Sequence, residues 1–146
     1  MELTMRGLVF VAAALLLGLG GIKVFSLATA GGQMTEVVDP VFGAPLYMLA
    51  LLAAAVEIGI GLWTIAQATR PKRAAVGFLF LGHSWLIYQG IRGVLPEPGR
   101  CPCLGQLPIW FPWLGAYETP ILLSIALWYV LVGWGLVIAE SNRLDS

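Results

Sequence analysis

The sequence predicts an all-α integral membrane protein, built as a four-helix bundle with one loop rich in Pro, Cys and Trp between its third and fourth helices. Of the 146 residues, 59% are hydrophobic and only 11% are charged, whereas a soluble domain carries about 25% charged residues. Folded in water, such a chain would expose large apolar patches. The length suits a single membrane domain over residues 1–146.

Four windows define the predicted helices. A bilayer-spanning helix needs about 20 mostly apolar residues, and the windows at about 7–30, 45–68, 74–93 and 120–139 meet this requirement. The second and fourth open with Pro45 and Pro120, because proline suits the first turn of a helix. We expect the remaining long segment, residues 94–119, to form a non-helical outer loop, since prolines are dense in it.

The charges of the connections predict the orientation. The turn at residues 69–73 carries three positive charges, which marks it as cytoplasmic. The two loops on the other side together contain one basic residue, Arg100. The sequence therefore predicts a protein of the cell (inner) membrane, with both termini in the cytoplasm and the cysteine loop outside it.

The first window also has features of a secretory signal. Arg6, the apolar run after it and the small residues Ala28-Thr29-Ala30 fit a signal peptide with a cleavage site. However, Lys23 interrupts the pattern and the apolar region is longer than usual. We expect residues 1–30 to be retained as a helix, with cleavage as the open alternative.

The composition also excludes some partners. The formal net charge is zero and no basic stripe is present to neutralise phosphates, so nucleic acid is not an expected partner. The lipid bilayer is the first expected partner.

Glu57 is the charge that most needs an explanation. It lies near the middle of the second window, where a carboxylate costs at least about 2.5–3.5 kcal/mol. We expect it to face the bundle interior, on a stripe of small residues that comprises Ala50, Ala53, Ala54, Gly61 and Thr64. Both a structural contact and a proton-relay role fit this position.

Two basic residues are candidate partners of Glu57. Lys23 lies toward the outer end of the first window and Arg92 at the outer end of the third. Both could instead extend to the headgroups. A direct bond to Glu57 requires these long side chains to bend inward, or a water between them.

His83 is the single histidine of the chain. It could ligate haem or a metal, but a hydrogen-bonded packing histidine is the favoured interpretation. No metal site is predicted.

The outer loop contains both cysteines, Cys101 and Cys103, with Pro102 between them. A Cys-x-Cys disulfide closes a very small ring, so we expect it to be strained and easily reduced. Arg100 would favour the thiolate of Cys101, which makes Cys101 the better nucleophile and Cys103 the resolving residue. An inert staple, a soft-metal site and a link to another chain remain alternatives.

The aromatic residues Trp110, Phe111 and Trp113 follow the cysteines. They suit the headgroup region, where they would hold the cysteine pair against the membrane surface.

In this order, the motifs resemble the MauE/DoxX-like family of four-helix membrane proteins, of the methylamine-utilisation MauE type. The matching segments, within roughly residues 8–140, are Gly21-Ile22-Lys23, Glu57-Ile58-Gly59 with Gly61, Arg92-Gly93 and Cys101-Pro102-Cys103-Leu104-Gly105. Leu104 replaces the aromatic residue that the family carries there.

The resemblance implies a redox pair, Cys101 and Cys103, supported by a polar network of Lys23, Glu57 and Arg92. MauE-type proteins are thought to help mature a disulfide-rich periplasmic dehydrogenase subunit beside a thioredoxin-like partner. DoxX-type relatives are linked to quinone redox chemistry, which makes quinone the one cofactor to consider.

The predicted function is thiol–disulfide electron transfer with an extracytoplasmic thioredoxin-like or disulfide-containing protein, as a candidate oxidoreductase. The alternative is a non-catalytic subunit of a larger membrane complex, which stripes of small residues and many tryptophans fit equally well. A transporter is disfavoured, because four helices are few and no broken-helix repeat is visible.

Overall fold

The computed structural model describes residues 2–34, 37–95 and 111–144, and these residues form four α-helices and no β-strand. The helices are α1 (Glu2–Met34), α2 (Leu46–Ala66), α3 (Pro71–Val94) and α5 (Pro112–Leu144). Each contains a stretch long and apolar enough to cross a membrane. The predicted all-α class is therefore confirmed for these residues, with four helices long and apolar enough to span a membrane.

The start of the last helix differs from the prediction. α5 begins at Pro112, and Pro120 lies inside it, so the prediction of a non-helical segment up to residue 119 was wrong. Pro112 occupies the first turn, where a missing amide has no helical partner, and the seven residues from Trp113 to Thr119 contain no proline. The Pro120 carbonyl accepts a hydrogen bond from Ser124 Oγ at 2.8 Å.

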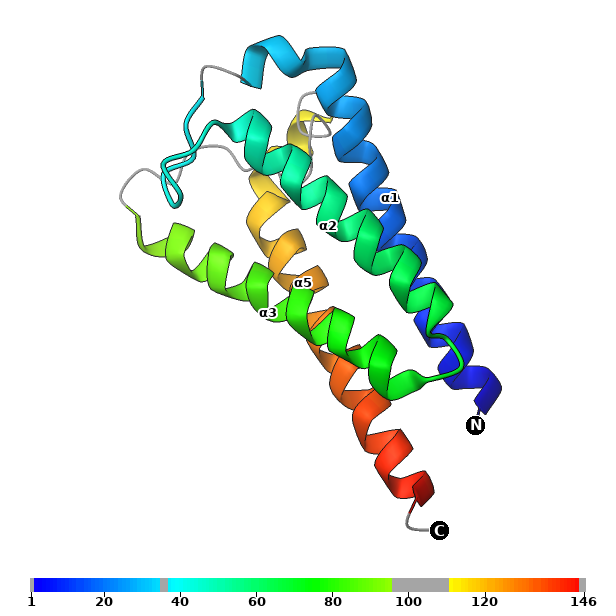
Figure 1. The fold of residues 1–146 in the computed structure, drawn as a ribbon. Coiled ribbons are helices and arrows are strands. Elements are labelled where there is room, and N and C mark those ends of the chain that lie inside the picture. The colour runs from blue at the N-terminus through cyan, green and yellow to red at the C-terminus, as the bar shows by residue number, and fades with distance from the viewer. Residues whose placement is uncertain (1, 35–36, 96–110, 145–146) are drawn as a thin grey trace.

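α1 and α3 also extend beyond their predicted windows, whereas α2 ends at Ala66, two residues before the end of its window. α3 starts at Pro71, which shortens its connection to α2. α1 continues to Met34 and bends near its C-terminal end (Figure 1). The hydroxyls of Ser26 and Thr29 bond back to the carbonyls of Ile22 and Phe25, a pattern that bends helices.

The helices pack as two pairs. α1 packs along α2, α3 packs along α5, and the pairs meet mainly where α2 contacts α3. Both termini and the α2–α3 connection lie at one end of the bundle, here called the turn end (Figure 1). Residues 37–45, the end of α3 and the start of α5 lie at the opposite end, here called the loop end.

The core changes character along the bundle. Toward the turn end it is mainly apolar, with Leu16, Ala75, Phe78 and Leu136 fully or almost fully buried. Thr64 is a buried polar residue in this part, and its hydroxyl donates to the Gly61 carbonyl of its own helix at 2.9 Å. Toward the loop end the buried residues include polar and charged side chains: Lys23, Ser26, Asp39, Glu57, Gln89 and Arg92. Buried polar groups are expensive in a membrane protein and commonly mark functional sites, so this part of the bundle is the candidate site.

Candidate functional site: a buried polar core at the loop end

The centre of the polar core is an ion pair between α1 and α2. Lys23 Nζ donates to both carboxylate oxygens of Glu57, at 2.5 Å and 2.6 Å. Each side chain is only 1% exposed. Because both oxygens of the carboxylate are engaged, each charge compensates the other in a place that water does not reach.

The length of α1 explains how the pair forms. Lys23 lies 11 residues before Met34, the end of α1, and Glu57 lies 11 residues after Leu46, the start of α2. The two residues of this antiparallel pair are therefore at similar depth. Lys23 and Glu57 therefore bond to each other directly, and the Lys23 side chain does not extend to the surface.

Glycines allow the two helices to approach at this level. A Cβ on Gly20 would lie 2.7 Å from Ile58 Cγ1, and one on Gly61 would lie 3.0 Å from Leu17. Gly20 is one turn from Lys23 and Gly61 one turn from Glu57, so the close contacts flank the ion pair. Of the predicted small-residue stripe, Ala50, Ala54, Gly61 and Thr64 are buried, and Ala53 is half-buried.

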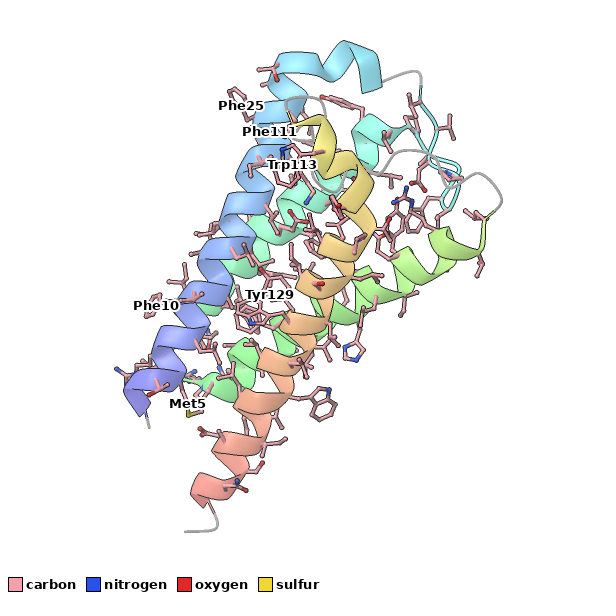
Figure 2. The ribbon with its side chains drawn as sticks, turned by 180° about the vertical axis from the view of Figure 1, so that it is seen from behind. Met5, Phe10, Phe25, Phe111, Trp113 and Tyr129 are labelled. Carbon is pink, nitrogen blue, oxygen red and sulfur yellow. The ribbon has the colours of Figure 1, made fainter. Side chains whose placement is uncertain are left out.

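Aromatic rings cover the pair on the side of α3 and α5. Lys23 Nζ lies 5.3 Å from the ring centroid of Trp85, a cation–π distance. Trp85 meets Tyr129 edge to face, and Tyr129 also stacks on Phe78. The Tyr129 hydroxyl donates to the Ala12 carbonyl at 3.2 Å, which joins α5 to α1 (Figure 2).

The polar core continues along one face of α3. Trp85, Gln89 and Arg92 follow one another at helical spacing, so they share a face, and Gln89 and Arg92 are buried. Arg92 donates to Gln89 Oε1 at 3.5 Å. This face therefore leads from the ion pair to the last turn of α3.

A short hairpin, residues 37–45, closes over the end of α3. Asp39 is fully buried, and its Oδ1 accepts the backbone amides of Val41 and Phe42 at 2.9 Å and 3.0 Å. Its Oδ2 accepts the Tyr88 hydroxyl at 2.6 Å. The Phe42 ring stacks on Tyr88, and the Arg92 guanidinium lies 5.9 Å from the same ring.

The turn inside the hairpin has an identifiable chemistry. Gly43 has φ of 62°, a left-handed conformation that favours glycine. Its amide donates to the Asp39 carbonyl at 2.8 Å, and the Asp39 amide donates to the Ala44 carbonyl at 2.9 Å. Asp39 therefore fixes both its own turn and the contact of that turn with α3.

The predicted site residues are only partly brought together. Lys23 and Glu57 form a direct pair, while Arg92 contacts Gln89 and Tyr88. Cys101, Cys103 and Arg100 lie outside the described residues.

The sequence interpretation missed Asp39, Tyr88, Gln89 and Trp85. Two signals could have found some of them. Asp39-Pro40 followed by Gly43 is typical of a turn that an aspartate stabilises. Gln89 and Trp85 lie on the Arg92 face of a predicted helix.

His83 does not pack between helices. Its side chain is exposed on α3, and its Nδ1 lies 2.7 Å from the Leu79 carbonyl, one turn earlier in its own helix. The predicted hydrogen bond is present, but the predicted packing role was wrong. The described residues contain no group of three or more His, Cys, Asp or Glu side chains that could hold a metal ion.

No family model matches the chain, and no curated protein and no solved structure matches it either. The fold and the polar core thus define a class only: a four-helix protein with helices fit to span a membrane and a compensated charge pair in its interior. Chemically, such a core can hold charge, donate and accept hydrogen bonds, and exchange protons among its side chains.

Proposed function

We propose that this chain is a membrane-embedded thiol–disulfide redox protein whose reacting groups are Cys101 and Cys103. The observation that supports the proposal most strongly is the polar core at the loop end. The segment that contains both cysteines connects the end of α3 to the start of α5, which lie at that same end. A purely structural bundle has no need of buried charges there, because well-packed apolar residues serve as well.

The exchange passes through a mixed disulfide on Cys101. The Cys101 thiolate attacks a partner disulfide and releases one partner thiolate. The Cys103 thiolate then attacks the Cys101 sulfur, which releases the second partner thiolate and closes the Cys101–Cys103 disulfide ring. In the reverse direction the same steps oxidise a partner dithiol. The two electrons and two protons left on the cysteines then pass to a second protein or to a quinone that diffuses in the bilayer.

The proposed orientation has the turn end in the cytoplasm and the loop end outside it. Arg70, Lys72 and Arg73 at the turn end support this orientation. Phe111 and Trp113 are exposed at the start of α5 near Phe25 (Figure 2), which suits residues in the headgroup layer at the loop end, on whichever side that end lies. The loop end would then face an oxidising compartment, where disulfides persist.

The resemblance to the MauE/DoxX-like family becomes part of the proposal. Two of its motif segments, Gly21-Ile22-Lys23 and Glu57-Ile58-Gly59, are far apart in the sequence and meet in the ion pair. This contact supports the polar network that the resemblance implies. A thioredoxin-like or disulfide-containing protein is the partner class that the resemblance suggests.

The test is a redox titration in native membranes with thiol trapping. We expect the Cys101–Cys103 pair to pass from disulfide to dithiol over a defined range of potential, and we expect Cys101→Ser to abolish partner oxidation. A pair that stays in one state, or a Cys101→Ser variant with normal partner oxidation, would refute the proposal.

The second candidate is a non-catalytic subunit of a larger membrane complex. The observation in its favour is that Gly18 and Gly21 of α1 and Gly135 of α5 have open space beside them on the bundle surface, as interfaces between membrane helices require. Obligatory co-purification with other subunits, together with unreactive thiols, would favour it over the redox proposal.

A further inference from the structure

We propose that the turn end holds a binding site for an anionic phospholipid, with an acyl chain in a groove between α2 and α3 and the phosphate beside Arg70, Lys72 and Arg73. This site lies at the opposite end of the bundle from the polar core, so it is independent of the proposed redox function.

The groove provides the place for the acyl chain. It has a volume of about 470 Å³, and the residues that line it are all apolar: Val56, Gly59, Ile60, Trp63, Val76, Gly77 and Phe80. Gly59 has nothing within 4 Å of its Cβ position, which leaves the groove open at that point. Val76 and Phe80 are each 61% exposed on its rim.

The groove leads directly to the basic turn. On α3, Lys72, Val76 and Phe80 are spaced four residues apart, so Lys72 lies one turn from the lining of the groove. One turn of helix is about 5.4 Å, a short distance for a flexible lysine side chain. Arg70, Lys72 and Arg73 are all exposed.

A negative charge would be stabilised at the first turn of α3. Backbone amides concentrate partial positive charge at a helix N-terminus. Here the N-cap is Arg70, without a side-chain cap hydrogen bond, and the first turn contains no acidic residue. Three cations therefore stand where the helix itself is already positive, which is unfavourable until an anion compensates them.

The complementarity identifies the occupant. An apolar chain joined to a phosphate matches an apolar groove that ends in three cations. Basic sites between membrane helices bind anionic headgroups by this combination. A zwitterionic phospholipid offers the same chain but no net charge.

The experiment is native mass spectrometry of the detergent-purified full chain. The purified protein is titrated with phosphatidylglycerol or, in a parallel series, with phosphatidylethanolamine that carries the same acyl chains. We expect phosphatidylglycerol to bind roughly tenfold more tightly. We expect Lys72→Gln to weaken its binding about fivefold and Arg6→Gln, which removes an equal charge outside the groove, to change it little.

A second pair of variants tests the groove. Gly59→Leu fills it and should weaken binding of both lipids, whereas Gly135→Leu, at an equally open glycine of α5, should not. Equal binding of the two lipids, equal effects of Lys72→Gln and Arg6→Gln, or lipid binding unaffected by Gly59→Leu would each overturn the proposal. So would a dimer that Gly59→Leu dissociates, because the groove would then hold a second copy of the chain.

Discussion

Lys23 and Glu57 carry opposite charges in the interior of the bundle, and each is 1% exposed. Taking both charges out of water costs several kcal/mol each, which the direct hydrogen bonds and mutual attraction offset. Removing one partner leaves the other buried without compensation. Replacing one member of the pair should therefore lower the free energy of unfolding by more than the intact pair contributes to it.

The first prediction concerns this pair. Glu57→Gln should retain the fold but lower the free energy of unfolding by about 3–5 kcal/mol, because Lys23 is left uncompensated. The double variant Lys23→Met/Glu57→Leu should recover most of the loss. Unfolding in detergent micelles, followed by tryptophan fluorescence, measures both effects, with Glu140→Gln as a control carboxylate near the turn end.

The same variants separate structure from function. If the pair takes part in redox chemistry, the double variant should be stable and yet reoxidise the Cys101–Cys103 pair slowly. Full reoxidation in that variant would leave the pair with a purely structural role. A Glu57→Gln variant as stable as the unmodified protein would contradict the energetic argument.

The second prediction concerns the contact of the hairpin with α3. Tyr88→Phe removes the hydroxyl that donates to Asp39 Oδ2, and a buried acceptor that loses its partner costs about 1–3 kcal/mol. Hydrogen exchange at the Val41 and Phe42 amides, which bond to Asp39 Oδ1, should become faster. Tyr117→Phe, at an exposed ring, is the control, and unchanged exchange in Tyr88→Phe would contradict the role of this contact.

At the scale of single residues, the sequence predicted which charged residue is buried but not which residue it pairs with. Glu57 could be placed inside the bundle because a carboxylate in lipid is costly. The choice between Lys23 and Arg92 required the relative depth of two helices, which depends on where α1 ends. Asp39 and Tyr88 are 49 residues apart, and no periodicity connects a loop residue to a helix at that separation.

At the level of helices, close packing depends on glycines at the contacts of α3 with α5. A Cβ on Gly82 would lie 2.8 Å from Val130 Cγ2 and 2.9 Å from the Ala126 carbonyl oxygen. A Cβ on Gly133 would lie 2.6 Å from Leu79 Cγ. These two helices could not keep their present separation with larger residues at both positions.

The third prediction follows from this contact. Gly82→Ala should destabilise the protein by about 1–3 kcal/mol, because a backbone oxygen cannot move aside without moving α5. Gly90→Ala, on the same helix with nothing within 4 Å, should be neutral or slightly stabilising, since alanine favours helix. Thermal unfolding of both variants in one detergent makes the comparison, and equal midpoints would contradict the packing argument.

The helices themselves could be predicted well because each contains a long apolar stretch, the strongest signal in a membrane protein. Their ends could not. Pro120 resembled a helix start, although Pro112 is the residue at the first turn of α5. Local proline chemistry is the same at both positions, so proline alone does not show which of the two begins the helix.

For the whole molecule, the four spans place both termini at the turn end, and the charge bias predicts which side that is. The fourth prediction uses a Cys101→Ser/Cys103→Ser background with one new cysteine. Thr69→Cys, in the exposed α2–α3 turn, should react with a membrane-impermeant maleimide only after cells are opened. Val94→Cys, 82% exposed at the end of α3, should react in intact cells, and the opposite pattern would invert the proposed topology.

The most direct test of the redox account is capture of a mixed disulfide in cells that produce the Cys103→Ser variant. Without Cys103 to resolve it, Cys101 should remain bonded to an extracytoplasmic protein, seen as a larger species that a reductant separates and mass spectrometry identifies. Cys101→Ser should give no such species. If Cys103→Ser captures no protein, or captures only cytoplasmic ones, the account is wrong.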